Sequence, residues 1–348
     1  MSESAQLPLG RILVGDALQQ LKTLPDAAVD CIVTSPPYFA MRDYNQPGQI
    51  GAEADVEAWA DGIAAVCAEL WRVLTPGGSL WLNLGDGFAR HPREGGTKKS
   101  LLLGPQRVAL RLTRKGWLLR NQIVWAKTNP MPSSVTDRFT TTHEFVYFFT
   151  KQPTYYFDLD AVREPPLSST TARGRPKSAS YPPRRAVPSL AGGKTSRINL
   201  NEGLVSLRSS GQGSHPLGKN PGDVWNAATA NYRDAHFATF PVELVRRPLL
   251  TTCPQRLCTA CGQPWRRATQ MINGRRLAVG RLMAACRCRA PSRPGIVLDP
   301  FIGSGTVAIA AETYERGWIG IELNPGYARL ALRRIADWRT QQDIAKQF

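Results

Sequence analysis

Residues 295–306 read Gly-Ile-Val-Leu-Asp-Pro-Phe-Ile-Gly-Ser-Gly-Thr. An apolar run, a glycine-rich turn and a helical pattern follow one another here, which predicts a strand, a tight turn and a helix. Glycines at 303 and 305 let the backbone approach a ligand closely, at the carboxyl end of a strand where doubly wound sheets bind nucleotides. No lysine follows the second glycine, so this turn is not a phosphate-binding P-loop.

The next predicted strand, residues 317–322, ends in Glu322, roughly twenty residues beyond the turn. A carboxylate at this place can bind both hydroxyls of a ribose. An ordinary strand-to-helix turn would need neither this acid nor Asp299 at the start of the turn. The two acids together therefore favour a bound nucleoside-containing cofactor.

The same alternation of short apolar runs and helical patterns extends over most of the chain. It predicts an α/β fold with a doubly wound, mostly parallel Rossmann-like sheet. We assign residues 9–160 and 221–348 to this domain. Further strands are expected at 11–14, 29–33, 79–82, 122–125 and 145–149, and helices at 56–73 and 325–338.

A second loop follows the predicted strand 29–33 and reads Thr34-Ser-Pro-Pro-Tyr38. Two consecutive prolines fix the backbone and leave neighbouring carbonyls without intramolecular donors. Such a loop suits a rigid acceptor site for an amino group, and the adjacent aromatic ring can stack on a base drawn out of a duplex. Taken alone, the Pro-Pro pair can simply mark a turn.

The two loops in combination resemble the amino-methyltransferases of bacterial and phage restriction-modification systems. The catalytic loop precedes the cofactor loop, as in the permuted beta class of that family, so the resemblance implies a circularly permuted methyltransferase sheet. It covers residues 9–150 and 220–338. It implies a site-specific DNA methyltransferase that flips a base out of duplex DNA and transfers a methyl group in line from S-adenosylmethionine.

The resemblance also implies which base is methylated. Serine at the first position of the catalytic loop is commoner among cytosine-N4 enzymes, and aspartate among adenine-N6 enzymes. With Ser35 in that position, we expect N4 of cytosine, and adenine-N6 is the nearest alternative. A cognate restriction endonuclease could accompany such an enzyme.

Catalytic roles carry over onto the first loop. Ser35 and the Pro36 carbonyl would accept hydrogen bonds from the target amino group, Pro37 would hold the loop rigid, and Tyr38 would stack on the flipped base. Asp86, in Asn-Leu-Gly-Asp after a predicted strand, could orient Ser35 or lie in a solvated turn.

Cofactor-binding roles carry over onto the second loop and its neighbours. Glu322 would bind the ribose, and Phe240 lies in a segment that resembles the one closing over the methionine end of S-adenosylmethionine. Asp16, after the first strand, matches a position near the cofactor. The remaining predicted cofactor-binding residues belong to the turn itself: Asp299, Phe301, Gly303, Gly305 and Thr306.

The charge of the chain points to a polyanionic partner. Lys and Arg number 44 against 27 Asp and Glu, for a net charge of +17, and phosphate contacts by such residues release counterions. Residues 161–220 hold ten basic and two acidic side chains in a Pro-, Ser-, Gly- and Thr-rich setting. This is either a basic target-recognition region for double-stranded DNA that orders on binding or a disordered linker, and the two interpretations are compatible.

Five of the seven cysteines fall between 253 and 288. Cys258 and Cys261 form one close pair, and Cys286 and Cys288 form another, with 24 residues between the two pairs. Four thiolates in two pairs predict a structural zinc ion in a small zinc-knuckle insert, residues 253–290. The second pair has a tighter spacing than usual, Cys253 is a spare, and unpaired surface thiols are the alternative. Five arginines around the site could touch phosphates: Arg256, Arg266, Arg267, Arg287 and Arg289.

No stretch reaches the length and apolarity of a membrane helix, and the N-terminus lacks the pattern of a signal peptide. We therefore expect a cytoplasmic, nucleoid-associated protein, encoded by a bacterium or phage, with no membrane partner. Two other functions remain open from sequence: a non-catalytic zinc-containing DNA-binding module, and methylation of RNA.

Overall fold

The computed structural model describes residues 7–44, 46–165, 215–230, 240–272 and 275–345. Most of the basic segment 161–220 lies outside these ranges, so its prediction as a target-recognition region is not tested by the structure. Within the described residues, no helix combines the length and apolarity needed to cross a membrane.

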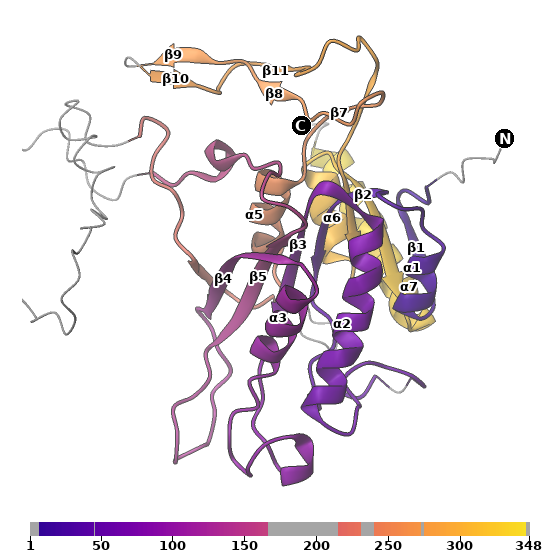
Figure 1. The fold of residues 1–348 in the computed structure, drawn as a ribbon, viewed down its shortest axis with the longest axis vertical. Coiled ribbons are helices and arrows are strands. Elements are labelled where there is room, and N and C mark those ends of the chain that lie inside the picture. The colour runs from indigo at the N-terminus through magenta and orange to yellow at the C-terminus, as the bar shows by residue number, and fades with distance from the viewer. Residues whose placement is uncertain (1–6, 45, 166–214, 231–239, 273–274, 346–348) are drawn as a thin grey trace, which may run out of the picture.

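An eight-stranded sheet runs through the molecule in the order β1-β14-β13-β2-β3-β5-β4-β6 (Figure 1). The first five strands of this order are mutually parallel, and β5 is antiparallel to both of its neighbours. The expected mostly parallel sheet is therefore confirmed. The strands span Arg11–Val14 (β1), Val29–Thr34 (β2), Leu74–Leu84 (β3), Leu118–Lys127 (β4), His143–Thr150 (β5), Val224–Ala227 (β6), Ile296–Asp299 (β13) and Gly317–Glu322 (β14).

Helices cover both faces of this sheet. One face carries α1, α2 and α3, and the other carries α5, α6 and α7. The helices span Ala17–Lys22 (α1), Val56–Val73 (α2), Gly104–Arg114 (α3), Val242–Thr252 (α5), Thr306–Thr313 (α6) and Pro325–Ala345 (α7), with short 3₁₀ turns at Pro92–Glu94 and Leu159–Val162. Helix α2 begins where Asp55 accepts a hydrogen bond from the Ala58 amide at 2.8 Å, the usual role of an aspartate at that position.

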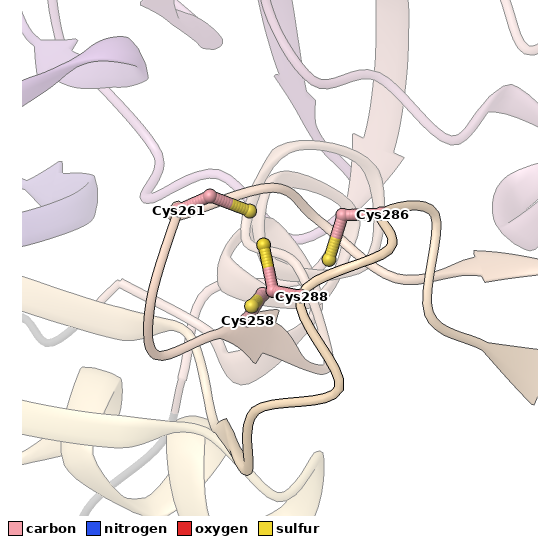
Figure 2. Close-up of side chains that lie close together, drawn as sticks. All are labelled: Cys258, Cys261, Cys286 and Cys288. Atoms are coloured by element: carbon pink, nitrogen blue, oxygen red, sulfur yellow. The ribbon is translucent and has the colours of Figure 1, made fainter.

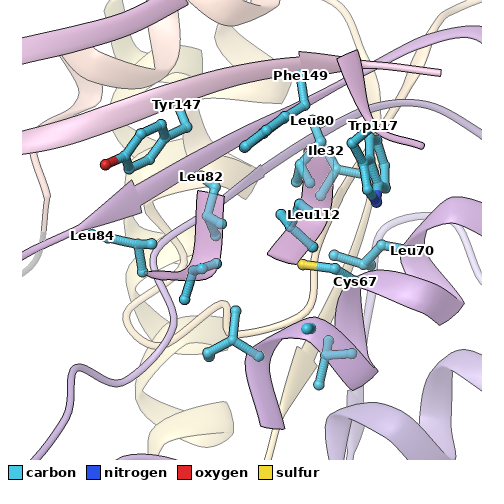
Figure 3. Close-up of a cluster of buried hydrophobic side chains, with 14 of the residues drawn as sticks. Ile32, Cys67, Leu70, Leu80, Leu82, Leu84, Leu112, Trp117, Tyr147 and Phe149 are labelled. Atoms are coloured by element: carbon cyan, nitrogen blue, oxygen red, sulfur yellow. The ribbon is translucent and has the colours of Figure 1, made fainter. Parts of the chain in front are cut away.

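Each face of the sheet packs into its own apolar core. Figure 3 shows the core beneath α2 and α3, where Leu70 and Leu112 meet side chains from β2, β3 and β5. Along β13, Val297 points into one core while Ile296 and Leu298 point into the other. Because both faces are covered, central strands are buried along their whole length, which is why they read as continuous apolar runs.

The sheet has a switch point between β13 and β2. β13 pairs with β14 on one side and with β2 on the other, and the helices that follow β13 and β2 pack on opposite faces of the sheet. The loops after these two strands therefore diverge and leave an opening at the carboxyl edge, where ligands bind in folds of this type. The glycine-rich turn and the Pro-Pro loop are the loops in question.

The cysteine-rich insert lies at the other edge of the sheet. It connects the end of α5 to the start of β13 and stands beyond the amino ends of the strands (Figure 1). Arg293 ties it down through Asp30 at the start of β2, with N–O distances of 2.6 and 3.1 Å. Its strands are very short and pair as β7 (Leu257–Cys258) with β12 (Ser292–Arg293), β8 (Arg266–Arg267) with β11 (Leu282–Met283) and β9 (Gln270–Ile272) with β10 (Arg275–Leu277).

Candidate active site and metal centre

A cavity of about 590 Å³ opens at the carboxyl edge between the two loops. Three of the predicted site residues, Asp86, Asp299 and Gly305, are not part of its wall. The predicted site residues that do line it are Asp16, Ser35, Pro36, Pro37, Tyr38, Phe240, Phe301, Gly303, Thr306 and Glu322. The structure therefore brings together in one cavity two loops that are more than 260 residues apart in the chain.

The glycine-rich turn has the backbone that its sequence requires. Gly303 and Gly305 have φ values of +48° and +82°, in the left-handed region that favours glycine. A Cβ on Gly305 would also lie 3.2 Å from Ile335 of α7, so this glycine lets the helices pack closely. The Gly303 amide donates to Glu322 Oε2 at 3.0 Å, and the Asn324 amide donates to Oε1 at 2.9 Å.

Glu322 is held rigidly at the cavity wall by these two amides. Burial raises the pKa of its carboxyl group, against the effect of the backbone hydrogen bonds. Each carboxylate oxygen can accept more than one hydrogen bond, so both can still receive a ribose hydroxyl. Asp16 lies beside it, because the Gly15 amide donates to the Glu322 carbonyl at 2.9 Å.

Asp299 lies beneath the cavity and joins the two loops. Its Oδ1 accepts from Thr34 Oγ1 at 2.7 Å and from the Phe301 amide at 3.0 Å. Its Oδ2 has no hydrogen-bond partner among the described residues. Burial raises the pKa of Asp299 to about 7, because a charged carboxylate in this place lacks solvent.

The Pro-Pro loop is fixed from outside. Pro37 accepts a hydrogen bond from Trp59 Nε1 at 2.9 Å, and a Cβ on Gly51 would come within 2.9 Å of the Tyr38 carbonyl. In the part of the chain that the structure describes, no hydrogen bond reaches the Pro36 carbonyl. Pro36 itself lines the cavity, so its carbonyl is left without an internal donor beside the space that a ligand would fill.

Sequence reasoning missed a polar cluster beside this loop. Tyr38 Oη donates to Glu144 Oε2 at 2.7 Å, Asn83 Nδ2 donates to the same oxygen at 3.0 Å, and Lys127 Nζ pairs with Glu144 Oε1 at 2.6 Å. Ser35 Oγ lies 3.1 Å from Tyr38 Oη. Burial, followed by the Glu144 charge, raises the pKa of Tyr38 well above its ordinary value.

Asp86 has other partners than the predicted Ser35. Its Oδ1 accepts from the amides of Gly87 at 2.9 Å and Gly104 at 3.1 Å, which fixes the loop before α3. Ser35 instead pairs with Tyr38. The hydrogen bonds of this structure thus place Tyr38 and Glu144, rather than Asp86, behind the serine.

Aromatic side chains complete the cavity. Phe240, which is predicted to close over the methionine end of the cofactor, is one of the residues that line the cavity. Tyr44 and Tyr327 face each other edge to face, with ring centroids 6.5 Å apart, and both line the cavity. Trp125 of β4 is buried and lines the cavity as well.

The chain is similar to known proteins over most of its length. The family described as DNA methylase, of the N6/N4 type, matches residues 29–333. The chain belongs to this family. It is 33% identical to the type II methyltransferase M.Cfr9I of Citrobacter freundii, over 96% of this chain and 90% of that protein. It is 34% identical to M.XycI of Xanthomonas campestris pv. cyanopsidis, over 92% of this chain and 86% of that protein.

Solved structures share the fold of this methylase. A putative DNA modification methylase of Thermus thermophilus, solved in complex with S-adenosyl-L-methionine, superposes with a TM-score of 0.51 at 24% identity, over 94% of this chain and 95% of that chain. The PvuII DNA methyltransferase, cytosine-N4-specific, gives 0.52 at 18% identity, over 96% and 95%. At these identities the likeness extends to the fold alone.

The methylase also carries a cluster of four cysteines in its insert. Figure 2 shows the thiols of Cys258, Cys261, Cys286 and Cys288 pointing toward one another, with all four sulfurs within 4.8 Å. A tetrahedron of thiolates around zinc has S–S edges of about 3.8 Å, from Zn–S bonds of about 2.3 Å. The cluster can thus hold a metal ion after a small contraction.

The first cysteine pair is shaped as a knuckle. Backbone amides of Cys261 and Ala260 donate toward the Cys258 sulfur and lower its pKa to about 7. The four cysteines are not joined by disulfides. The spare Cys253 is buried away from them, in the core on the face of the sheet that α5, α6 and α7 cover. Because the insert stands at the amino edge, the arginines around it are remote from the cavity at the carboxyl edge.

Proposed function

We propose that the methylase transfers a methyl group from S-adenosylmethionine to N4 of cytosine within a specific duplex DNA sequence. The observation that carries this is the meeting of two loops in one cavity. Ser35 and Pro36 present hydrogen-bond acceptors on one wall, and Gly303 and Glu322 present a close backbone and a carboxylate on another. The target base must reach this cavity from the duplex, which requires base flipping.

The cavity fits the cofactor by the chemistry of its wall. Glu322 would bind the ribose hydroxyls, the backbone at Gly303 would allow close approach, and Asp16, Phe301, Thr306 and Phe240 would surround the rest. The cofactor supplies a methyl group on a positively charged sulfur. Asp299 would act from beneath by fixing the turn.

The protein's part in the reaction is to position the target and stabilise charge. An exocyclic amino nitrogen is a poor nucleophile, because its lone pair is delocalised into the ring. Acceptors at Ser35 and Pro36 would favour a pyramidal nitrogen aimed at the methyl group and stabilise the positive charge that develops there. Holding nitrogen, carbon and sulfur in line accounts for much of the remaining acceleration. Tyr38 would stack on the flipped base.

Cytosine is favoured over adenine on two grounds. Ser35 occupies the position where serine is commoner in cytosine-N4 enzymes. Lys127 also lines the cavity, and its ammonium is a donor suited to O2 of cytosine, an acceptor that adenine lacks. Adenine-N6 transfer would use the same fold and loops.

DNA recognition is assigned to the basic segment 161–220, as a target-recognition region between the two parts of the catalytic domain, 9–160 and 221–348. The relatives described as type II methyltransferases support action on a defined duplex sequence, with a cognate restriction endonuclease as a further partner. Cys258, Cys261, Cys286 and Cys288 would hold one structural zinc ion in the insert 253–290.

Identification of the methylated nucleoside tests this proposal. The protein is incubated with duplex DNA and methyl-labelled S-adenosylmethionine, and the DNA is digested to nucleosides that are identified by mass. We expect the label in N4-methylcytosine. Label in N6-methyladenine would overturn the choice of base, and no label in any DNA, with the cofactor still bound, would overturn the proposed reaction.

A further inference from the structure

Glu144 lies at the centre of the polar cluster beside the catalytic loop. Its side chain is only 13% exposed, and it comes from the start of β5, where it pairs in register with Trp125 of β4. One carboxylate oxygen receives Tyr38 Oη and Asn83 Nδ2, and the other receives Lys127 Nζ. All three neighbours lie around the same cavity as Ser35.

The chemistry of these groups fixes the direction of each hydrogen bond. A carboxylate can only accept, so the single proton of Tyr38 points to Glu144. The raised pKa of Tyr38 keeps that proton on its oxygen. Tyr38 Oη therefore has only lone pairs left for Ser35 Oγ, 3.1 Å away, and the serine must donate its own proton to the tyrosine.

Ser35 then faces the cavity with lone pairs only. A target amino group has two N–H donors, and its lone pair is delocalised into the base, so it needs a hydrogen-bond acceptor at this point. A serine proton that points into the cavity would place a donor against these N–H groups. The direction of the Ser35 hydroxyl is thus set by Tyr38, three residues along the loop, and through it by Glu144 on β5.

We infer that Glu144 is a positioning residue, which acts through Tyr38 to make Ser35 an obligatory acceptor for the target amino group. This rests on the proposed function, since it assumes amino transfer at Ser35. It adds a role that neither loop motif contains, because Glu144 follows Ser35 by 109 residues in the chain. Asn83 and Lys127 assist by holding the carboxylate in place.

Replacement of Glu144 by glutamine should reverse the chain of hydrogen bonds. The amide has one acceptor and one donor end, whereas all three neighbours donate to the carboxylate. With its NH₂ group toward Lys127, the amide would face a charged donor. With its NH₂ group toward Tyr38 and Asn83, the Asn83 amide must turn its unpartnered oxygen to the glutamine, and the tyrosine must accept and pass its proton to Ser35. The second arrangement avoids the charged clash, and it turns the Ser35 proton toward the cavity.

The test is the single-turnover rate of methyl transfer to duplex DNA by four proteins: unaltered, Glu144→Gln, Tyr38→Phe and the double variant. We expect Glu144→Gln to slow transfer roughly 10- to 100-fold, as loss of an orienting partner does elsewhere. The dissociation constant for S-adenosylmethionine should change less than about twofold. In the Tyr38→Phe background, Glu144→Gln should cost less than about twofold more, because the link to Ser35 is already absent.

A matched control is Glu312→Gln. Like Glu144, Glu312 is a carboxylate that accepts from a cationic and an aromatic side chain, here Arg339 and Trp318. It lies on α6 outside the cavity wall, so its replacement should leave the rate unchanged. The inference is overturned if Glu144→Gln transfers within about twofold of the unaltered protein, or if the two costs multiply in the double variant. Tyr38→Phe keeps the carboxylate in place, so it tests the same link should Glu144→Gln fold poorly. Absence of transfer by the unaltered protein would instead contradict the proposed function, and the inference with it.

Discussion

At the carboxyl edge of the sheet, two loops shape the cavity. Buried strands hold these loops in place, together with buried hydrogen bonds such as the one from Thr34 to Asp299. At the amino edge, the insert consists of strand pairs only two or three residues long. The first edge inherits its geometry from a core that exists without any ligand. The second has little apolar side chain to bury.

The two edges of the sheet therefore owe their ordered structure to different causes. Segments that cannot bury enough apolar surface need another source of stability, and a metal ion is one of the few available. The four cysteines are placed where such a source is needed, between the end of α5 and β13. We therefore expect the two edges to respond differently to the same perturbation.

The largest expected effect is the loss of metal from the insert. The double variant Cys258→Ser/Cys286→Ser removes one ligand from each pair, and metal-coupled folding of such sites is worth roughly 10 kcal/mol or more. Elemental analysis should find one zinc per unaltered chain and none in the variant, and limited proteolysis should cut the variant within the insert, residues 253–290. Binding of S-adenosylmethionine should change less than about twofold.

Cys67→Ala serves as the control, since it removes a buried thiol of the α2 core and should leave the zinc content at one. Two results would contradict the separation of the edges: zinc-free unaltered protein with an intact insert, or a variant that loses cofactor binding together with the metal.

A smaller effect concerns pH and belongs to the carboxyl edge. Burial raises the pKa of Asp299 to about 7, from about 4 in an unfolded chain. The folded state therefore binds the proton more tightly, and the contribution of Asp299 to stability is full below pH 4 and declines as pH rises through 7. Between pH 5 and 8 this amounts to roughly 2 to 3 kcal/mol.

Asp299→Asn removes this titration. Chemical denaturation at pH 5 and pH 8 should show that the variant loses less stability over this interval than the unaltered protein does. The same pH dependence in both proteins would show that Asp299 does not carry the proton.

The smallest effect comes from a close approach behind Tyr38. A Cβ on Gly85 would lie 2.6 Å from Cε2 of the Tyr38 ring, whereas a Cβ on Gly87 would meet nothing within 4 Å. Gly85→Ala should displace the ring at a cost of about 1 to 3 kcal/mol and slow methyl transfer, and Gly87→Ala should do neither. Equal rates for the two variants, with equal thermal stability, would show that the ring position is not critical.

The two loops could be predicted from sequence because each is a contiguous motif next to a strand. The strands themselves were predictable because burial on both faces makes them apolar throughout. The start of β3 could not be predicted, because Pro-Gly-Gly at 76–78 is typical of a turn. In the structure, Leu74 already pairs with Val29 of β2.

Glu144 shows why part of the site escaped sequence reasoning. Its approach to Tyr38 depends on β5 lying antiparallel between β3 and β4, and no local pattern encodes that pairing. For Asp86 the sequence left two roles open, orienting Ser35 or lying in a turn, and its side chain accepts from the amides of Gly87 and Gly104. The signal in the sequence was an acid, Glu144, directly before the apolar run 145–149 of a predicted strand.

The central claim is that one cavity combines a loop for chemistry with a loop for cofactor binding. Single-turnover methyl transfer, measured over a range of S-adenosylmethionine concentrations, tests it directly with Ser35→Ala and Glu322→Ala. We predict that Ser35→Ala lowers the limiting rate roughly 10²- to 10³-fold with little change in cofactor affinity. Glu322→Ala should weaken cofactor binding by about tenfold or more and leave the limiting rate within a few-fold. An unchanged limiting rate for Ser35→Ala, or unchanged affinity for Glu322→Ala, would contradict the account.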